Sequence, residues 1–109
     1  MTYEVKLSEQ AYIDLRGVFE YIAFELKAPE NANSQLNRLE ERILSLDTMP
    51  ERHRKYEKEP WKSRGLRILP IDNYLVFYTT NTDIKVVTIL RVMYAGRDID
   101  NQLNFNTKQ

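Results

Sequence analysis

Three arginines and one tyrosine in the second half of the chain are the side chains best suited to act on an anionic substrate. They lie on or just beyond short runs of β-branched and aromatic residues, and they are Arg67, Arg91, Tyr94 and Arg97. Guanidinium groups bind phosphate oxygens and can stabilise the charge that develops while a phosphodiester is cleaved. These four residues are the predicted catalytic set if the chain is a nuclease. Together with Lys62 and Arg64 they form the predicted target-binding surface.

Arg91 is the most informative of these residues because it lies inside a β-branched run, where burying an unpaired guanidinium group is very costly. One interpretation is that Arg91 projects from an open face of the sheet toward a phosphate or a carboxylate. The other is that it pairs with an internal acid such as Asp72 or Asp98. The sequence leaves both interpretations open.

Other reactive groups have little support in the sequence. The only histidine, His53, lies between Arg52 and Arg54, has no metal ligand at a suitable spacing, and has its pKa lowered by these cations. The chain has no cysteine. It also lacks a Ser/His/Asp constellation, a glycine-rich phosphate loop and an HExxH motif. We therefore predict neither a metal nor a cofactor.

Composition places the chain among ordinary globular proteins. Its 109 residues suffice for a single domain, predicted over residues 1–109, with 42% hydrophobic and 29% charged residues. No window approaches the roughly 18 apolar residues of a membrane span, and residues 1–10 lack the apolar core of a secretory signal. We expect a cytoplasmic protein with no membrane partner.

The formal net charge of zero hides a separation of charge along the chain. Residues 1–50 carry five basic and nine acidic side chains, whereas residues 51–97 carry ten basic and five acidic ones. This asymmetry favours an anionic partner for the second half, either nucleic acid or an acidic protein surface. The alternative is that the acidic and basic parts simply neutralise one another.

Apolar periodicities predict the order β-α-α-β-β-β. Alternation over residues 2–7 predicts a strand, and helical spacing over 11–26 and 32–46 predicts two helices separated at Pro29. β-Branched and aromatic runs over 66–69, 74–80 and 84–94 predict three strands. The predicted fold class is α+β, with two layers: a helical hairpin packed on a mostly antiparallel four-stranded sheet.

The remaining segments are predicted to be less ordered. Residues 51–64 show no periodicity and are predicted to form a partly mobile connector. A last helical turn is predicted after Asp98, followed by a frayed tail over about residues 101–109. We expect the hairpin to cover one face of the sheet and to leave the other face open and cationic.

In this order the segments resemble the RelE/ParE superfamily of toxins from type II toxin–antitoxin systems. The matching segments are LSEQAYIDLRGVFEYIA, PENANSQLNRLEERILSLDTMP, RGLRILPIDNYLVFYT and VVTILRVMYAGRDI. The resemblance spans residues 2 to about 100 and implies the same β-α-α-β-β-β fold. It also implies a cytoplasmic toxin that inhibits growth, stabilises plasmids and is neutralised by a cognate antitoxin. Operator DNA is expected to be bound only through that antitoxin.

Two modes of action share this fold. The ParE branch inhibits DNA gyrase without known catalysis, whereas the RelE branch cuts mRNA on the ribosome. The RelE pattern expects an arginine where this chain has Leu75, directly after Tyr74, and another where it has Ala95. We therefore predict a ParE-like gyrase inhibitor. A ribosome-dependent mRNA endonuclease is the alternative, and an inactive relic that acts only with its antitoxin in operon autoregulation is a weaker one.

Overall fold

Two helices form a hairpin in the first half of the structure, a computed structural model that describes residues 2–96 and 98–107. Ser8 begins α1 (Glu9–Glu20), because its side-chain oxygen accepts a hydrogen bond from a backbone amide of the first turn. The helix continues through a π-helical turn, η1 (Tyr21–Glu25), and Pro29 then opens α2 (Pro29–Leu44). Proline suits this position because its missing N–H is not needed there. The predicted helical hairpin is confirmed.

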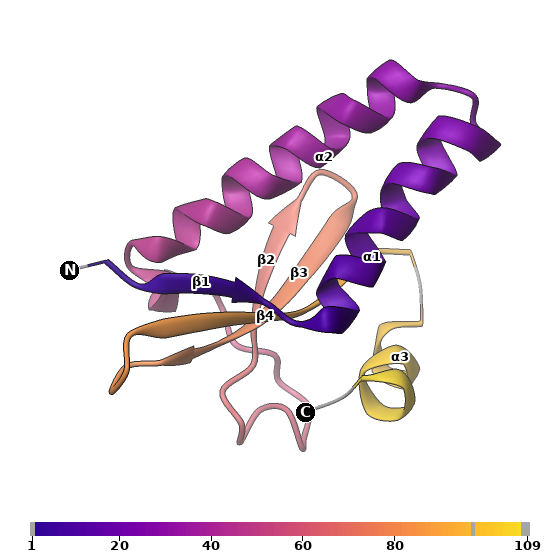
Figure 1. Ribbon diagram of the computed structural model, residues 1–109. Coiled ribbons are helices and arrows are strands. Elements are labelled where there is room, and N and C mark those ends of the chain that lie inside the picture. The colour runs from indigo at the N-terminus through magenta and orange to yellow at the C-terminus, as the bar shows by residue number, and fades with distance from the viewer. Residues whose placement is uncertain (1, 97, 108–109) are drawn as a thin grey trace.

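Four strands form one sheet in the order β1-β4-β3-β2. β2 (Arg67–Ile71) and β3 (Tyr74–Asn81) are antiparallel, as are β3 and β4 (Val86–Tyr94), whereas β1 (Glu4–Leu7) runs parallel to β4. Figure 1 shows the two long helices together, with α3 (Ile99–Asn106) apart from them. The predicted α+β fold with a mostly antiparallel four-stranded sheet is confirmed.

The larger hydrophobic core lies between the hairpin and the sheet. Helix residues Leu15, Leu39 and Ile43 are buried in one cluster with strand residues Val76 and Ile89. The helix residues belong to the apolar stripes that predict the hairpin, so periodicity and packing agree. No helix in the described part of the chain is long and apolar enough to cross a membrane.

The opposite face of the sheet is also covered, which contradicts the prediction of an open cationic face. A second cluster of buried residues comprises Tyr56, Trp61, Leu66, Ile68, Phe77, Met93 and Leu103. Tyr56 and Trp61 come from the segment that the sequence predicts to be a mobile connector. Two short 3-10 turns, η2 (Ser45–Asp47) and η3 (Pro50–Arg52), lead into this segment. The connector is therefore part of the core, because its two aromatic rings bury apolar surface against the sheet.

The C-terminal segment is ordered further than predicted. α3 continues to Asn106 and Leu103 is fully buried, so the frayed tail predicted from about residue 101 does not include residues 101–106. The Trp61 indole N–H donates a hydrogen bond to Asn104 (2.9 Å), and the Tyr56 hydroxyl donates one to the carboxylate of Asp100. Residues 108 and 109 lie outside the described residues. A few apolar residues on a short helix are a weak signal in the sequence, and the second face of the sheet is what allows Leu103 to be buried.

A register shift between the last two strands changes the direction of the side chains near Arg91. Phe77 lies opposite Arg91, but the next residue, Tyr78, lies opposite Ile89. β4 therefore contains one extra residue, Leu90, which forms a β-bulge. Strict alternation groups Ile89 with Arg91 on one face of the sheet, and this grouping fails at the bulge.

Candidate functional site

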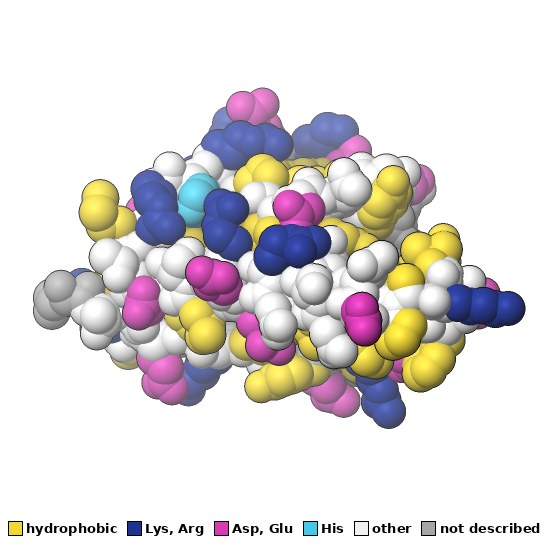
Figure 2. All heavy atoms as spheres, turned by 90° about the horizontal axis from the view of Figure 1, so that it is seen from above, with side chains coloured by type: hydrophobic (Ala, Val, Ile, Leu, Met, Phe, Trp, Pro, Cys, Tyr) yellow, Lys and Arg dark blue, Asp and Glu magenta, His cyan; other side chains and the backbone are white. Residues whose placement is uncertain are grey.

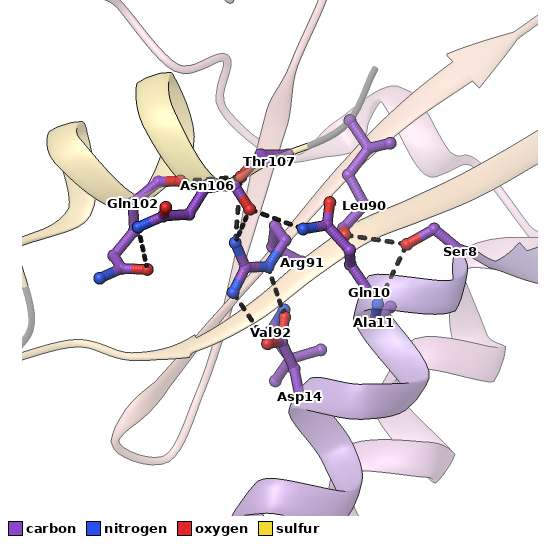
Figure 3. A network of polar contacts seen from close by, with 10 residues as sticks. All are labelled: Ser8, Gln10, Ala11, Asp14, Leu90, Arg91, Val92, Gln102, Asn106 and Thr107. Carbon is purple, nitrogen blue, oxygen red and sulfur yellow. Dashed lines mark hydrogen bonds and ion pairs between the residues drawn. The ribbon is translucent and has the colours of Figure 1, made fainter.

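Arg91 lies inside the protein, at the edge of β4 just beyond the end of β1 (Figure 3). Its guanidinium group forms a two-pronged ion pair with Asp14 of α1, with Nε–Oδ2 and Nη2–Oδ1 distances of 2.7 and 2.9 Å. The amide of Val92 donates to the same carboxylate (2.9 Å), and Ser8 Oγ donates to the carbonyl of Leu90 (2.9 Å). The start of α1 thus satisfies the backbone groups of β4 that β1 no longer reaches.

Arg91 also fastens the C-terminal helix. Its Nη1 donates to the carbonyl of Asn106 (2.9 Å), and the Arg91 and Asp14 side chains are only 8% and 11% exposed. The geometry of Arg91 therefore agrees with the second interpretation, in which it pairs with an internal acid. The acid is Asp14 rather than Asp72 or Asp98, because α1 passes the edge of β4 beside Arg91.

The other predicted target-binding residues come from several elements of the described chain. Lys62 and Arg64 lie on the connector, where the Arg64 guanidinium stacks over the ring of Trp61 at 5.2 Å from its centre. Tyr94 is exposed at the end of β4. Arg97 lies outside the described residues. Among the described residues, the members of the predicted surface therefore come from the connector, β2 and β4, and a single surface shared by all of them stays a prediction.

Arg67 belongs to a group of basic side chains that we call the His53 cluster: Arg42, Arg52, His53 and Arg67. Arg67 Nη1 donates to the backbone carbonyl of His53 (2.7 Å). Arg52 folds back on its own turn, and its Nη1 donates to the carbonyl of Met49 (3.1 Å). Arg42 comes from the last turn of α2. Three elements that are distant in sequence therefore place guanidinium groups around one imidazole.

The surface view in Figure 2 shows this cluster from outside. The single cyan side chain is that of His53, the only histidine, and dark blue Lys and Arg side chains lie on both sides of it. Burial lowers the pKa of His53, and the positive charges of Arg52, Arg42 and Arg67 lower it further. At neutral pH the imidazole is therefore uncharged, and the guanidinium groups supply the positive charge of the cluster.

A buried tyrosine holds the histidine and the η3 turn in place. The Tyr78 hydroxyl donates to the carbonyl of Pro50 (2.5 Å), and burial raises the pKa of Tyr78 to about 12. The ring of His53 packs edge-on against that of Tyr78, with centres 6.4 Å apart. His53 Nε2 is buried and has no hydrogen-bond partner in the described part of the chain. The cluster is thus held in place, and it contains one buried polar atom without a partner among the described residues.

Only part of the charge in the His53 cluster is compensated. Glu51 lies 3.6 Å from Arg67, measured from its carboxylate to Nη2. Within residues 2–96 and 98–107, no carboxylate lies within ion-pair distance of Arg42 or Arg52. Such an arrangement can bind an anion.

A groove of about 970 Å³ lies beside the hairpin, and we call it the hairpin groove. Part of its lining is apolar and 53–58% exposed: Ile13, Tyr21, Leu26 and Tyr94. The polar lining comes from α2 and the turn between β2 and β3: Asn31, Ser34, Gln35, Arg38 and Asn73. Exposed apolar residues rimmed by polar ones are typical of a surface that binds a protein segment.

Gly17 of α1 lines the same groove. A Cβ atom added at Gly17 meets no atom within 4 Å, so internal packing does not require glycine there. The absence of a side chain leaves the groove wider at this point. In Figure 2, several hydrophobic side chains lie at the end of the face away from the histidine.

Sequence reasoning missed Arg42, Arg52 and the hairpin groove. In the sequence, Arg42 resembles any solvated charge near a helix end. The available signal is Pro50, which opens the η3 turn that carries Arg52 and leads to His53. For the groove, the signal is that Ile13 and Tyr21 fall outside the apolar stripe of their helix. Metal chemistry has no such support: no group of three or more His, Asp or Glu side chains converges among the described residues.

Several solved structures share this fold. The chromosomal ParDE toxin–antitoxin system of P. aeruginosa aligns with 20% identity and a TM-score of 0.70, covering 85% of this chain and 96% of that one. The RelBE2 toxin–antitoxin complex of Mycobacterium tuberculosis aligns with 22% identity and a TM-score of 0.63, covering 86% and 92%. The archaeal RelE–RelB complex of Pyrococcus horikoshii aligns with 25% identity and a TM-score of 0.58, covering 89% and 99%. The comparison with curated protein sequences found no match.

A protein-family model identifies the family. The model described as the ParE toxin of the type II toxin–antitoxin system, parDE, matches residues 5–99. The match includes the helical hairpin, the connector and nearly the whole sheet, so it covers most of the 109 residues. The chain belongs to the ParE toxin family of type II toxin–antitoxin systems.

Proposed function

We propose that the chain is a ParE-like toxin that inhibits DNA gyrase by binding it, without catalysis, and that a cognate antitoxin neutralises it. The family match over residues 5–99 supports the toxin role. Gyrase as the target follows from the resemblance to the ParE branch, and such a target requires action in the cytoplasm.

The positions of the candidate catalytic side chains support binding rather than catalysis. Arg91 is occupied by an internal ion pair. Arg67 lies opposite Tyr78, and Tyr94 lies opposite Tyr74, four residues away on β3. Four residues of strand span about 13 Å. General acid–base catalysis needs its groups within hydrogen-bond reach of the same substrate, which this separation does not offer.

We further propose that the hairpin groove receives a segment of the antitoxin. The groove offers exposed apolar side chains from α1 and η1 beside polar side chains from α2. An amphipathic segment would bury its apolar residues on the first set and hydrogen bond to the second. Two of the structural relatives are named as toxin–antitoxin complexes, which agrees with a protein partner of this kind.

A supercoiling assay tests the proposed target. Purified chain is added to gyrase, ATP and relaxed plasmid, and we expect supercoiling to be lost. In parallel, the chain is added to a translation reaction, where we expect the mRNA to remain intact. Cleavage of mRNA between codons with normal supercoiling would establish the endonuclease alternative. No effect in either assay, with no arrest of growth on expression, would favour the inactive relic.

Filling the groove tests the antitoxin site. Gly17→Leu fits α1 because the added side chain meets open space at its first atom. We expect affinity for the cognate antitoxin to fall at least about tenfold, which corresponds to about 1.4 kcal/mol. The matched control is Arg16→Leu, one residue away, which lines a separate hollow. Wild-type affinity of Gly17→Leu in a calorimetric titration would exclude the groove as the site.

A further inference from the structure

We infer that the His53 cluster binds the phosphate backbone of duplex DNA. The choice of duplex DNA rests on the proposed function, because gyrase holds a DNA duplex while it acts. The inference adds a direct contact between this toxin and DNA, separate from any contact with gyrase and from the antitoxin's operator site.

Part of the positive charge of the His53 cluster has no acidic partner among the described residues. Arg38 and Arg42 lie one turn apart on α2, and Arg38 pairs with Asp72 at 2.8 Å. In the part of the chain that the structure describes, Arg42 has no such partner, and neither does Arg52. Both of these side chains are exposed. Like charges that are held close together repel one another, and a bound anion relieves that repulsion.

Two guanidinium groups of the cluster are already held in place before any anion binds. Arg67 is only 15% exposed and is held by the carbonyl of His53 and by Glu51. Arg52 donates hydrogen bonds to the backbone carbonyls of Thr48 and Met49. Tyr78 anchors the η3 turn through the carbonyl of Pro50. A guanidinium group presents several N–H donors in a fixed fork that matches phosphate oxygens. Side chains that are already fixed lose little freedom when the anion binds.

The positive surface extends beyond the His53 cluster along the outer edge of β2. Lys55 forms an isolated β-bridge with Arg67, and the amide of Ile68 donates to the carbonyl of Arg54 (3.0 Å), so residues 54 and 55 lie along the outer edge of β2. Residues 51–67 carry seven basic side chains against three acidic ones. A single phosphate would need only the His53 cluster, whereas a polyanion such as DNA uses the whole edge.

The experiment measures binding of the full chain to a fluorescein-labelled duplex of about 20 base pairs by anisotropy over about 50–200 mM salt. For three to four phosphate contacts, we expect the logarithm of the association constant to fall against the logarithm of salt with a slope of about −3. Arg42→Gln should reduce this slope by about 1 and weaken binding severalfold for every DNA sequence. The matched control is Arg16→Gln, which removes the same charge from an exposed arginine on α1 and should leave the slope unchanged.

Three results would overturn the inference: an Arg42→Gln variant that binds DNA like the wild type, equal losses in Arg42→Gln and Arg16→Gln, or tighter binding to single-stranded RNA of the same length. The supercoiling assay separates this inference from the proposed function. Loss of supercoiling without any DNA binding by the chain alone refutes the inference and leaves the proposed function intact. Binding to DNA that depends on Arg42, with normal supercoiling, supports the inference and refutes gyrase as the target.

Discussion

Two groups of arginines in this molecule have opposite environments. Arg91 is buried, and its Nε, Nη1 and Nη2 atoms all donate hydrogen bonds, two of them to Asp14. Arg42 and Arg52 are exposed, and no carboxylate in the described residues pairs with them. The first arrangement joins α1, β4 and α3. The second leaves positive charge at the surface for an external partner.

The surroundings of these arginines, rather than their places in the sequence, therefore decide their roles. Arg91 stands out in the sequence because it interrupts an apolar run, yet its charge is neutralised inside the protein. Arg42 is inconspicuous on a helix with many charges, yet the fold brings it beside two other guanidinium groups. An internal pair makes an arginine part of the fold, and the absence of a pair makes it available to a ligand.

Breaking the buried pair should have the largest effect on stability. Asp14→Asn leaves the Arg91 guanidinium buried without a charge partner, and we expect the free energy of unfolding to fall by about 3 kcal/mol. The change can be measured by urea unfolding, followed through the fluorescence of Trp61, the only tryptophan.

The matched control is Asp72→Asn, which makes the same change in the exposed pair with Arg38. Asn tolerates the left-handed backbone of residue 72, where φ is 54°. We expect no measurable change in the urea midpoint, because exposed ion pairs contribute little. Equal losses of unfolding free energy in Asp14→Asn and Asp72→Asn would show that the pair of Asp14 with Arg91 is not buried in solution.

Removing the apolar anchor of α3 should have the next largest effect. Leu103 is fully buried on the second face of the sheet, so Leu103→Ala should lower the free energy of unfolding by about 2–4 kcal/mol. Phe105→Ala, on the same helix, is the control: Phe105 is 80% exposed, and its loss should change stability by less than about 0.5 kcal/mol. Equal urea midpoints for Leu103→Ala and the wild type would mean that α3 does not pack on the sheet in solution.

The elements of the fold could be predicted from the sequence because each carries its own local pattern. The stripe that includes Leu39 and Ile43 predicts α2, and Pro29 marks where this helix starts. The run that includes Val87 and Ile89 predicts the last strand. The spacing of apolar residues and the positions of proline and glycine are local features of a few residues, so they can be seen directly in the sequence.

The site could not be predicted in the same way because it depends on contacts between distant residues. The pairing of Asp14 with Arg91 joins residues 77 positions apart. The bulge at Leu90 changes which side chains share a face, and alternation cannot reveal it. The burial of Trp61 depends on the second face of the sheet, which the pattern of the connector does not show. Charge counts therefore located the basic half of the chain but not the guanidinium groups that remain unpaired.

The smallest expected effect is the pH dependence that His53 gives to the exposed cluster. Burial and the neighbouring Arg52, Arg42 and Arg67 lower the pKa of His53 below its ordinary value of 6.5. The unfolded chain therefore binds more protons than the folded one just below pH 6.5. The contribution of His53 to the free energy of unfolding is therefore fully present above about pH 6.5. It is lost as the pH falls from there through the pKa of His53 in the folded protein.

We expect the wild type to lose more stability than His53→Gln when urea unfolding is compared at pH 7.5 and pH 5.5. The charged groups that face His53 do not produce this difference, because arginines stay protonated, the pKa of Tyr78 is about 12, and carboxylates such as Glu51 are present in both proteins. Adding inorganic phosphate at pH 5.5 should restore part of the loss in the wild type, since an anion favours the protonated imidazole. Identical pH dependence in the two proteins would show that the cluster does not perturb His53, and no response to phosphate would show that it does not bind anions.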